Sequence, residues 1–270
     1  MGANRKHLAM TITPNKWELD VQGYLNVCNI TDATPRKQIR DFSAGVNDLG
    51  LWNSMVCWPL RSSQNYGSGT TAYSLGGLGT FNGTLVNGPS WGVDGVTFDA
   101  VSQFAHVPDV VSSEPLNVFV RRSGSTPAVS TALIAQWAAP SSRSWMVRSS
   151  NSDATKLRID ASSDGSVGGI RTLDAASGTF PTSDTTVVGV WADGSDALIF
   201  SNKTQLETTV FAPGLSNTRI NVSIEILING VGTVASPSGF AGGLYRAVAI
   251  VPVSMTSGQR EQMTDLINAL

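Results

Sequence analysis

The chain has 270 residues, of which 14% are charged, and its formal net charge is −2 at pH 7. Residues 1–40 contain six Lys and Arg against three Asp and Glu, whereas residues 41–270 contain twelve against seventeen. This local excess of positive charge is far smaller than that of a nucleic-acid-binding module, so we expect no nucleic-acid partner. Cys28 and Cys57 are the two cysteines, and they exclude a disulfide framework and a zinc site of clustered Cys and His.

The sequence predicts neither a secretion signal nor a membrane span. Residues 1–14 lack the apolar run, about 7–15 residues long, of a signal peptide, and no apolar run of about 18 residues occurs. The two cysteines fit a protein that is made in a reducing compartment.

Residues 1–33 mix polar and apolar side chains without sustained periodicity. A segment of this kind has no core of its own and is ordered by what it binds. We interpret it as an attachment arm that contacts another subunit through Arg5, Lys6, Trp17 and Tyr24.

Residues 34–50 predict an amphipathic helix. Pro35 suits the first helical position, and Gly50 suits the end of the helix. Four apolar side chains fall on one face of it: Ile39, Phe42, Val46 and Leu49. Residues 51–60 are densely apolar and end at a proline-leucine pair, so we expect them to be buried. We assign 34–71 to this helix and an apolar connector.

From about residue 72 the sequence is typical of an all-β sandwich. Short strand-like runs are separated by Gly, Asn, Asp, Pro and Ser, without βα alternation or a long repeat. Over 219–230, isoleucine and valine alternate with polar residues, which predicts a strand with one face in the core. Two antiparallel hairpins are also predicted: 144–150 with 156–162, and 185–191 with 197–202.

A closing helix is predicted over residues 256–270. Thr256 and Gln259 have capping-box spacing, and the apolar residues that follow repeat at helical spacing. We expect this helix to pack on the edge of the sandwich. We therefore assign 72–270 to one β-sandwich with its closing helix.

The residues that catalysis would need are sparse. Glycoside hydrolysis uses two carboxyl groups ~5–9.5 Å apart, and none of the five glutamates has a second acid close by on the same predicted strand face. His106 is the one histidine of the body, and no G-x-S-x-G elbow or P-loop is present. Acids from distant strands could still converge, so a polysaccharide lyase or hydrolase stays as a third hypothesis. We expect no enzyme.

Three tryptophans are candidate glycan-binding residues, because aromatic faces stack on sugars. Trp91, Trp137 and Trp145 flank turns or alternate with polar neighbours, which could leave their rings exposed. Packing between sheets and loops is the competing interpretation for each. Trp52, Trp58 and Trp191 lie in apolar contexts, and we expect them in the core.

Asp193 and Asp196, in the turn ADGSD, are candidate calcium ligands, because calcium prefers clustered oxygen atoms. Asp-Gly is first of all a hairpin signal, and no EF-hand loop fits the sequence. We therefore expect no cofactor, with calcium at this turn as the alternative.

Three segments carry a resemblance to a known family: GTFNGTLVNGPSWGVDGVTFDAVSQFAHVPD, LIAQWAAPSSRSWMVRSSNSDATKLRIDASSDG and FAGGLYRAVAIVPVSMTSGQREQMTDLINAL. They resemble the entry segment, the central hairpin and the last strand with closing helix of laminin-G-like (concanavalin A-like) jelly rolls. The resemblance covers about residues 75–270 and implies a two-sheet jelly-roll sandwich. The E-x-D-x-x-E strand of the family's glucan-cleaving members is absent, which argues against their activity.

A narrower resemblance lies upstream, in QIRDFSAGVNDLGLWNSMVCWPL. It is similar to bacteriophage virion proteins in which a short helix, a G-x-W step and an aromatic-Pro segment precede a lectin-like domain. This resemblance implies a non-enzymatic virion protein on the particle surface, a head decoration protein or a fibre or tail component, anchored through its N-terminal region.

The virion interpretation carries expectations about partners and location. We expect other capsid or tail subunits and further copies of the chain as partners, and assembly into the virion in the bacterial cytoplasm. The alternative, from a different class, is a carbohydrate-binding module that recognises host surface glycans.

Overall fold

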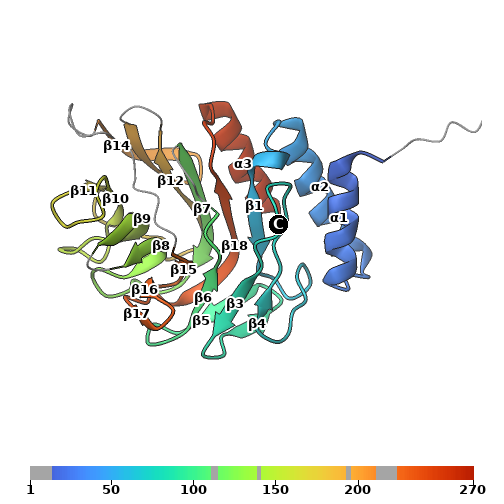
Figure 1. The fold of residues 1–270 in the computed structure, drawn as a ribbon, viewed down its shortest axis with the longest axis horizontal. Coiled ribbons are helices and arrows are strands. Elements are labelled where there is room, and N and C mark those ends of the chain that lie inside the picture. Colours follow the sequence, from blue (N-terminus) through green and yellow to red (C-terminus); the bar gives the residue numbers. More distant parts are fainter. Residues whose placement is uncertain (1–13, 111–114, 139–140, 193–195, 211–223) are drawn as a thin grey trace, which may run out of the picture.

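The computed structural model describes residues 14–110, 115–138, 141–192, 196–210 and 224–270. Within these residues, the strands form two antiparallel sheets stacked face to face, and helices cover the outside of one of them (Figure 1). The chain repeatedly changes sheet, as from β3 to β4 and from β5 to β6, which is the connectivity of a jelly roll. The predicted all-β, two-sheet jelly-roll sandwich is confirmed.

Sheet A has the following spatial order: β14 (Thr204–Val210), β13 (Asp196–Ser201), β12 (Thr185–Trp191), β7 (Leu116–Ser123), β18 (Gly243–Val251), β5 (Gly95–Phe98) and β4 (Ser90–Gly92). β1 (Val56–Pro59) pairs with β18 beside this path, with Val56 opposite Ile250.

Sheet B has the order β11 (Ile170–Asp174), β10 (Leu157–Ser162), β9 (Ser142–Ser149), β8 (Ala132–Ala138), β15 (Ile226–Ile228), β6 (Phe104–Val107), β3 (Gly83–Val86) and β2 (Thr71–Ala72). β16 (Val231–Thr233) and β17 (Ser236–Ser238) form a separate hairpin, and β16 packs beside β8.

The main core lies between the two sheets. Its largest fully buried side chains include Trp58, Trp145, Trp191 and Tyr245. The Trp145 and Trp191 rings contact each other across the sandwich, with centroids 5.6 Å apart. The expectation that Trp52, Trp58 and Trp191 are buried is confirmed.

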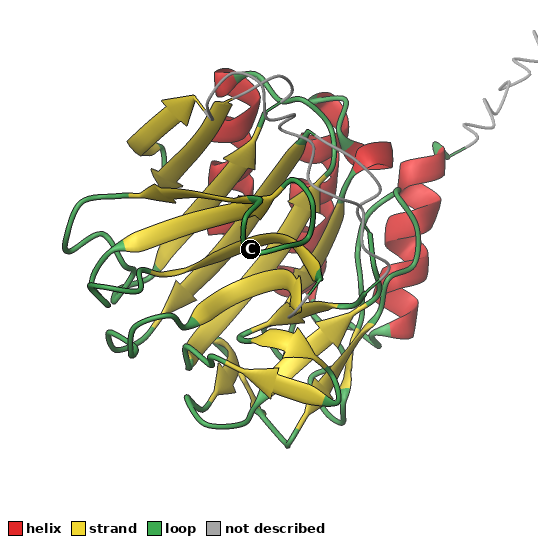
Figure 2. Cartoon of the chain, turned by 60° about the vertical axis from the view of Figure 1, so that its left-hand side comes forward, coloured by secondary structure: helices red, strands yellow, loops and turns green. Residues whose placement is uncertain are grey.

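A second core lies between sheet A and the helices α1 (Lys16–Val27), α2 (Ala33–Asp48) and α3 (Ser257–Ala269) (Figure 2). Residues 247–251, AVAIV, explain why both faces of sheet A are buried. Val248 and Ile250 point into the inter-sheet core, while Ala247, Ala249 and Val251 lie under the helices. A strand buried on both faces reads as a continuous apolar run, as this one does.

The predicted helix at 34–50 is confirmed as α2. Ile39, Phe42 and Val46 are buried, and Leu49 packs against the same cluster. Gly50 adopts a φ of 72°, and the following N–H of Leu51 donates to the carbonyl of Val46 at 3.1 Å, which ends the helix in a Schellman-type turn.

The apolar connector is buried, as expected. Its residues form the one-turn helix η1 (Trp52–Ser54) and the wholly buried strand β1. The helix and the sandwich therefore share one hydrophobic body.

Two expectations about helices are wrong. Residues 16–27 form α1, where an irregular arm was expected, and Val21 and Leu25 are buried against the body. The closing helix α3 carries the predicted capping box between Thr256 and Gln259, but it does not lie at an edge. It packs on the outer face of sheet A, over β7 and β12, because the apolar surface that it covers is there.

Both predicted hairpins are confirmed. β9 pairs with β10, with Ser149 opposite Leu157, and β12 pairs with β13, with Trp191 opposite Ala197. Of the predicted strand at 219–230, the described part is β15, whose Ile226 and Ile228 are core residues; residues 219–223 lie outside the described chain.

Among the helices that the structure describes, we find none with the length and apolar character that crossing a membrane requires.

Candidate functional site

The outer face of sheet B lacks the helical cover of sheet A, although several side chains on it are themselves buried, such as Met146, Arg148 and Asp160. On β10, Leu157, Ile159 and Ala161 point into the core, so Arg158 and Asp160 between them point outward. No described helix packs on this outer face, because the element contacts of α1, α2 and α3 run to one another and to η1, β7 and β12. A strand that alternates in this way has one face for the core and one for other contacts.

A groove of about 310 Å³ lies on this face, called here the sheet B groove. Its floor is formed by side chains of β8 to β11: Trp137, Met146, Arg148, Arg158, Ile170 and Thr172. Val231 of β16 and Val167 of the β10–β11 loop add apolar side chains to its lining. Its volume is at the lower end of the range of small-molecule sites.

The apolar part of the floor is a small cluster of its own. Trp137 and Met146 pack with Ala132 and Ala135, and Ile170 and Val231 lie against them. Trp137 is 7% exposed, so little of its ring is open for a sugar to stack on. An apolar patch beside convergent polar groups is the usual composition of a ligand site.

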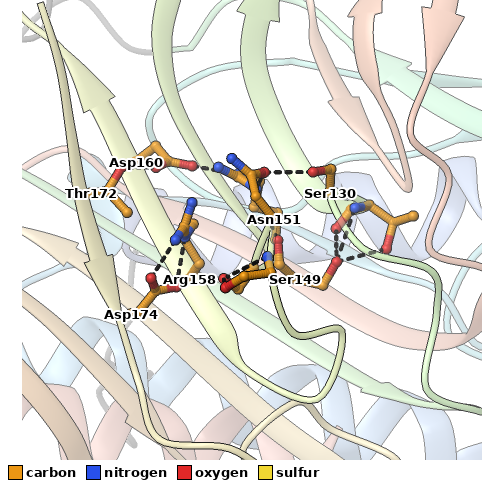
Figure 3. A network of polar contacts seen from close by, with 11 residues as sticks. Ser130, Ser149, Asn151, Arg158, Asp160, Thr172 and Asp174 are labelled. Carbon is orange, nitrogen blue, oxygen red and sulfur yellow. Dashed lines mark hydrogen bonds and ion pairs between the residues drawn. The ribbon is translucent and has the colours of Figure 1, made fainter.

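A buried ion pair lies in the same floor. The Nε of Arg148 donates to Asp160 at 2.5 Å, Asp160 is fully buried, and the Thr172 hydroxyl donates to its other oxygen at 2.6 Å. Arg148 also donates to the carbonyl of Ser149 and to the side chain of Asn151, which accepts from Ser130 as well (Figure 3). The guanidinium of Arg148 is therefore held in one orientation.

A second ion pair lies beside the first. Arg158 binds Asp174 in bidentate fashion across β10 and β11, with Nε donating to Oδ1 at 2.6 Å (Figure 3). The hydrogen bond from Arg158 lowers the pKa of Asp174, and the same contact raises the pKa of Arg158. Both groups therefore stay charged near neutral pH.

Other hollows lie next to α1. The largest, about 500 Å³, is bounded by Trp17, Val21 and Ala44 and reaches Pro14, next to the undescribed residues 1–13. The sheet B groove is the better candidate site, because rigid strands hold both its apolar and its charged side chains.

The three candidate tryptophans lie in three different places. Trp137 lines the sheet B groove, whereas Trp91 lies half-buried on the edge strand β4, where its Nε1 donates to the carbonyl of Gly69 at 3.0 Å. Trp145 is fully buried between the sheets, and its Nε1 donates to Gln136 at 3.0 Å. The expectation of an exposed Trp145 ring is wrong, because its position on β9 faces inward.

Asp193 and the side chain of Asp196 lie outside the described part of the chain, so calcium at this turn stays a prediction. Among the residues that the structure describes, no three His, Cys, Asp or Glu side chains lie close enough together to hold a metal ion.

Two of the four candidate attachment residues lie in the described part of the chain and two do not. Arg5 and Lys6 lie outside the described residues. Trp17 packs edge-on against Trp52, with ring centroids 6.5 Å apart, and the buried Tyr24 donates to the carbonyl of Gln64 at 2.6 Å. Tyr24 therefore fixes α1 to its own chain, and its burial removes it from any surface that could contact another subunit.

Sequence reasoning missed the arginines and aspartates of the sheet B groove. A signal for them exists in the two hairpin strands: Arg148 on β9, and Arg158 and Asp160 on β10, alternate with residues that become core. Charged residues at every second position of two paired strands must share one face. The sequence pattern alone therefore predicts that these arginine and aspartate side chains lie on one face of the hairpin.

No protein-family model matches the sequence, and no curated protein matches it. Solved structures do share its architecture. Botulinum neurotoxin type C superimposes with a TM-score of 0.57 at 11% identity, over 81% of this chain and 52% of the toxin chain. A mutant sialidase of Trypanosoma rangeli gives 0.54 at 11% identity, over 86% of this chain and 39% of the sialidase.

A third structure, the CBM40 module of the Ruminococcus gnavus IT-sialidase with α2,3-sialyllactose, gives a TM-score of 0.46 at 12% identity, over 57% of this chain and 83% of the module. The chain thus spans about half of the toxin chain and less than half of the Trypanosoma rangeli sialidase. At 11% identity, the likeness to these two structures shows the fold alone, which is a jelly-roll β-sandwich.

Proposed function

We propose that this protein is a non-catalytic saccharide-binding module and that its ligand lies in the sheet B groove. The observation that carries the proposal is the contrast between the two sheets. Helices cover the outer face of sheet A, whereas the outer face of sheet B holds a groove with an apolar floor and oriented polar groups.

The groove has the two kinds of surface that a sugar ring needs. The apolar side chains of Met146, Ile170 and Val231 can pack against the C–H face of a ring. Arg158, Asn151 and Thr172 supply hydrogen-bonding groups beside these apolar side chains. Because strands hold most of these groups and hydrogen bonds from Arg148 and Ser130 fix Asn151 in its loop, little conformational entropy is lost when a ligand binds.

The structural likeness is compatible with this proposal by analogy of fold. The uptake of botulinum neurotoxin type C into cells is described as dependent on two ganglioside molecules. The Trypanosoma rangeli structure is that of a mutant sialidase that displays trans-sialidase activity. Both proteins meet glycans, and the sheet B groove is where this chain would do so.

The test is a glycan array followed by titration calorimetry with the best ligand. The double variant Val167→Ala/Ile170→Ala removes apolar contacts from the groove and is expected to weaken binding roughly tenfold, from about 0.7 kcal/mol lost per side chain. The matched control is Val93→Ala/Val101→Ala, since these exposed valines lie outside the groove lining.

The control should leave both affinity and melting temperature unchanged. Equal affinity of the two double variants would place the ligand elsewhere. Absence of binding to every glycan on the array at high protein concentration would reject the saccharide-binding function itself.

We further propose that the module is carried on a bacteriophage particle. The support is the sequence resemblance over residues 38–60, together with Leu19 and Val27, two exposed apolar side chains on α1. Exposed side chains of this kind suit contact with another virion subunit or with a further copy of the chain.

The virion proposal predicts that the protein remains with purified particles after washing in high salt, which quantitative mass spectrometry would measure. Leu19→Glu/Val27→Glu is expected to reduce incorporation at least tenfold, because the contact would bury two unpaired carboxylates of each chain. Val93→Glu/Val101→Glu adds the same charge on another surface and should incorporate normally. Particles that lack the protein would contradict the proposal.

A further inference from the structure

We infer that the sheet B groove selects saccharides that carry a carboxylate, such as hexuronic or sialic acid residues, over neutral saccharides. The inference rests on the proposed saccharide-binding function and names the ligand class of that same groove. It follows from the charges of the lining, their orientation and the local charge balance.

Among the described residues, the charged side chains that line the groove are all arginines: Arg143, Arg148 and Arg158. The aspartates that pair with two of them are not part of the lining. Asp160 is fully buried beneath Arg148, and Asp174 lies beside Arg158 on the neighbouring strand. The groove lining itself therefore offers guanidinium groups to a ligand, and the partly exposed Asp174 lies outside that lining, on the Nε side of Arg158.

The aspartates orient these guanidinium groups as well as neutralising part of their charge. Asp160 binds the Nε of Arg148, and Asp174 binds Nε and Nη2 of Arg158. A guanidinium fixed through its Nε side keeps a defined plane, and its planar array of donors matches a carboxylate. The side-chain entropy of both arginines is already lost before a ligand arrives.

The chemistry of the donors distinguishes acidic from neutral sugars. Arginine donates hydrogen bonds and accepts none, whereas a sugar hydroxyl does both. Arginine donates a charge-assisted hydrogen bond to either group, but a carboxylate adds an opposite charge and a second acceptor oxygen that allows bidentate pairing. A groove lined by three arginines therefore stabilises a carboxylate more than a hydroxyl.

The local charge balance points the same way. Segment 142–174, which contains β9, β10 and β11, holds five Lys and Arg against four Asp, although the whole chain has a net charge of −2. The three arginines of the groove and the two aspartates paired with them likewise sum to +1, so the groove is slightly positive on an acidic protein.

The experiment compares ligand pairs that differ in charge, with the full chain and titration calorimetry. The pairs are trigalacturonic acid with its methyl ester, and 3′-sialyllactose with lactose. We expect the acidic member of at least one pair to bind at least ten times more tightly. Raising NaCl from about 0.05 M to about 0.5 M should reduce that preference, because the added salt screens the interaction.

Three single variants distinguish direct contact between an arginine and the ligand from a general effect of positive charge. Arg143→Gln and Arg158→Gln are each expected to weaken binding of the acidic ligand about tenfold and binding of the neutral member clearly less, because the neutral member loses a hydrogen bond but no charge interaction. Arg171→Gln is the matched control, since Arg171 lies on β11, outside the groove lining, and binds the carbonyls of Gly168 and Ile170. Arg148 is not substituted, because its loss would strand the buried Asp160.

The outcomes distinguish failure of the carboxylate preference from failure of the saccharide-binding function. Equal binding of acidic and neutral members overturns the carboxylate preference and leaves saccharide binding intact. Binding of no member of either pair overturns the carboxylate preference, and with no binding on the glycan array it overturns the saccharide-binding function as well. Sulfated oligosaccharides that bind as tightly as carboxylated ones, or an equal loss for Arg171→Gln, would replace carboxylate recognition with attraction of anions in general.

Discussion

Trp145→Ala is expected to lower the free energy of unfolding by about 3–5 kcal/mol, as large truncations of buried aromatic residues do. Trp145 is fully buried between the sheets, contacts Trp191 and donates a hydrogen bond to Gln136. The truncation removes these contacts and leaves a cavity that rigid strands on both sides cannot close. Urea unfolding followed by circular dichroism would measure the change.

Trp91→Ala is the control for that measurement. It removes the same side chain from a half-buried position on the edge strand β4, so we expect a loss of about 1–2 kcal/mol, in proportion to the smaller buried area. Equal losses would contradict the inward orientation of Trp145. A further consequence concerns binding experiments: reduced glycan binding by Trp145→Ala would report on folding, so Val167 and Ile170 are the informative positions.

Asp160→Ala is expected to cost a similar amount, about 3–5 kcal/mol, for a different reason. The substitution leaves the Arg148 guanidinium charged and buried without its carboxylate, and it removes the acceptor of the Thr172 hydroxyl. Urea unfolding would again measure it. Arg148→Met/Asp160→Leu removes both charges and should recover most of the loss, because apolar side chains can replace a buried pair.

Asp174→Ala is the matched control for burial. It breaks the neighbouring Arg–Asp pair, whose side chains are 12% and 34% exposed against 7% and 0% for Arg148 and Asp160, so removing Asp174 opens Arg158 to water. We expect a loss of about 0–1 kcal/mol. Comparable losses for Asp160→Ala and Asp174→Ala would contradict the view that burial makes the first pair costly to break.

The sequence of α1 contains a helical pattern, although an irregular arm was expected there. Val21, Tyr24 and Leu25 stand at helical spacing, and the capping box of Asn15 and Glu18 precedes them. The helix is short and its polar residues surround a narrow apolar stripe, so the pattern is weaker than that of α2. It becomes stable through packing against the body, which the sequence of α1 alone does not contain.

The tryptophans show the same division at the candidate site. The residue order shows that Trp137 and Trp145 have polar neighbours in the chain, but the face of the sheet on which each ring lies depends on strand register. The ladder between β8 and β9 is interrupted between Gln136 and Trp137, so counting along the chain does not assign the faces. Trp137 therefore reaches the groove, while Trp145 enters the core.

By itself, the sequence determined the fold class, the helix α2, both hairpins and the capped closing helix, because turn residues, caps and apolar periodicity act over a few residues. Only the tertiary structure decided which sheet the helices cover and which charged side chains meet in the sheet B groove. The groove joins Val231 to residues near 140–172, and such a contact depends on how distant strands stack. The local sequence determines which side chains share one face of a strand, and the packing of distant elements determines what that face contacts.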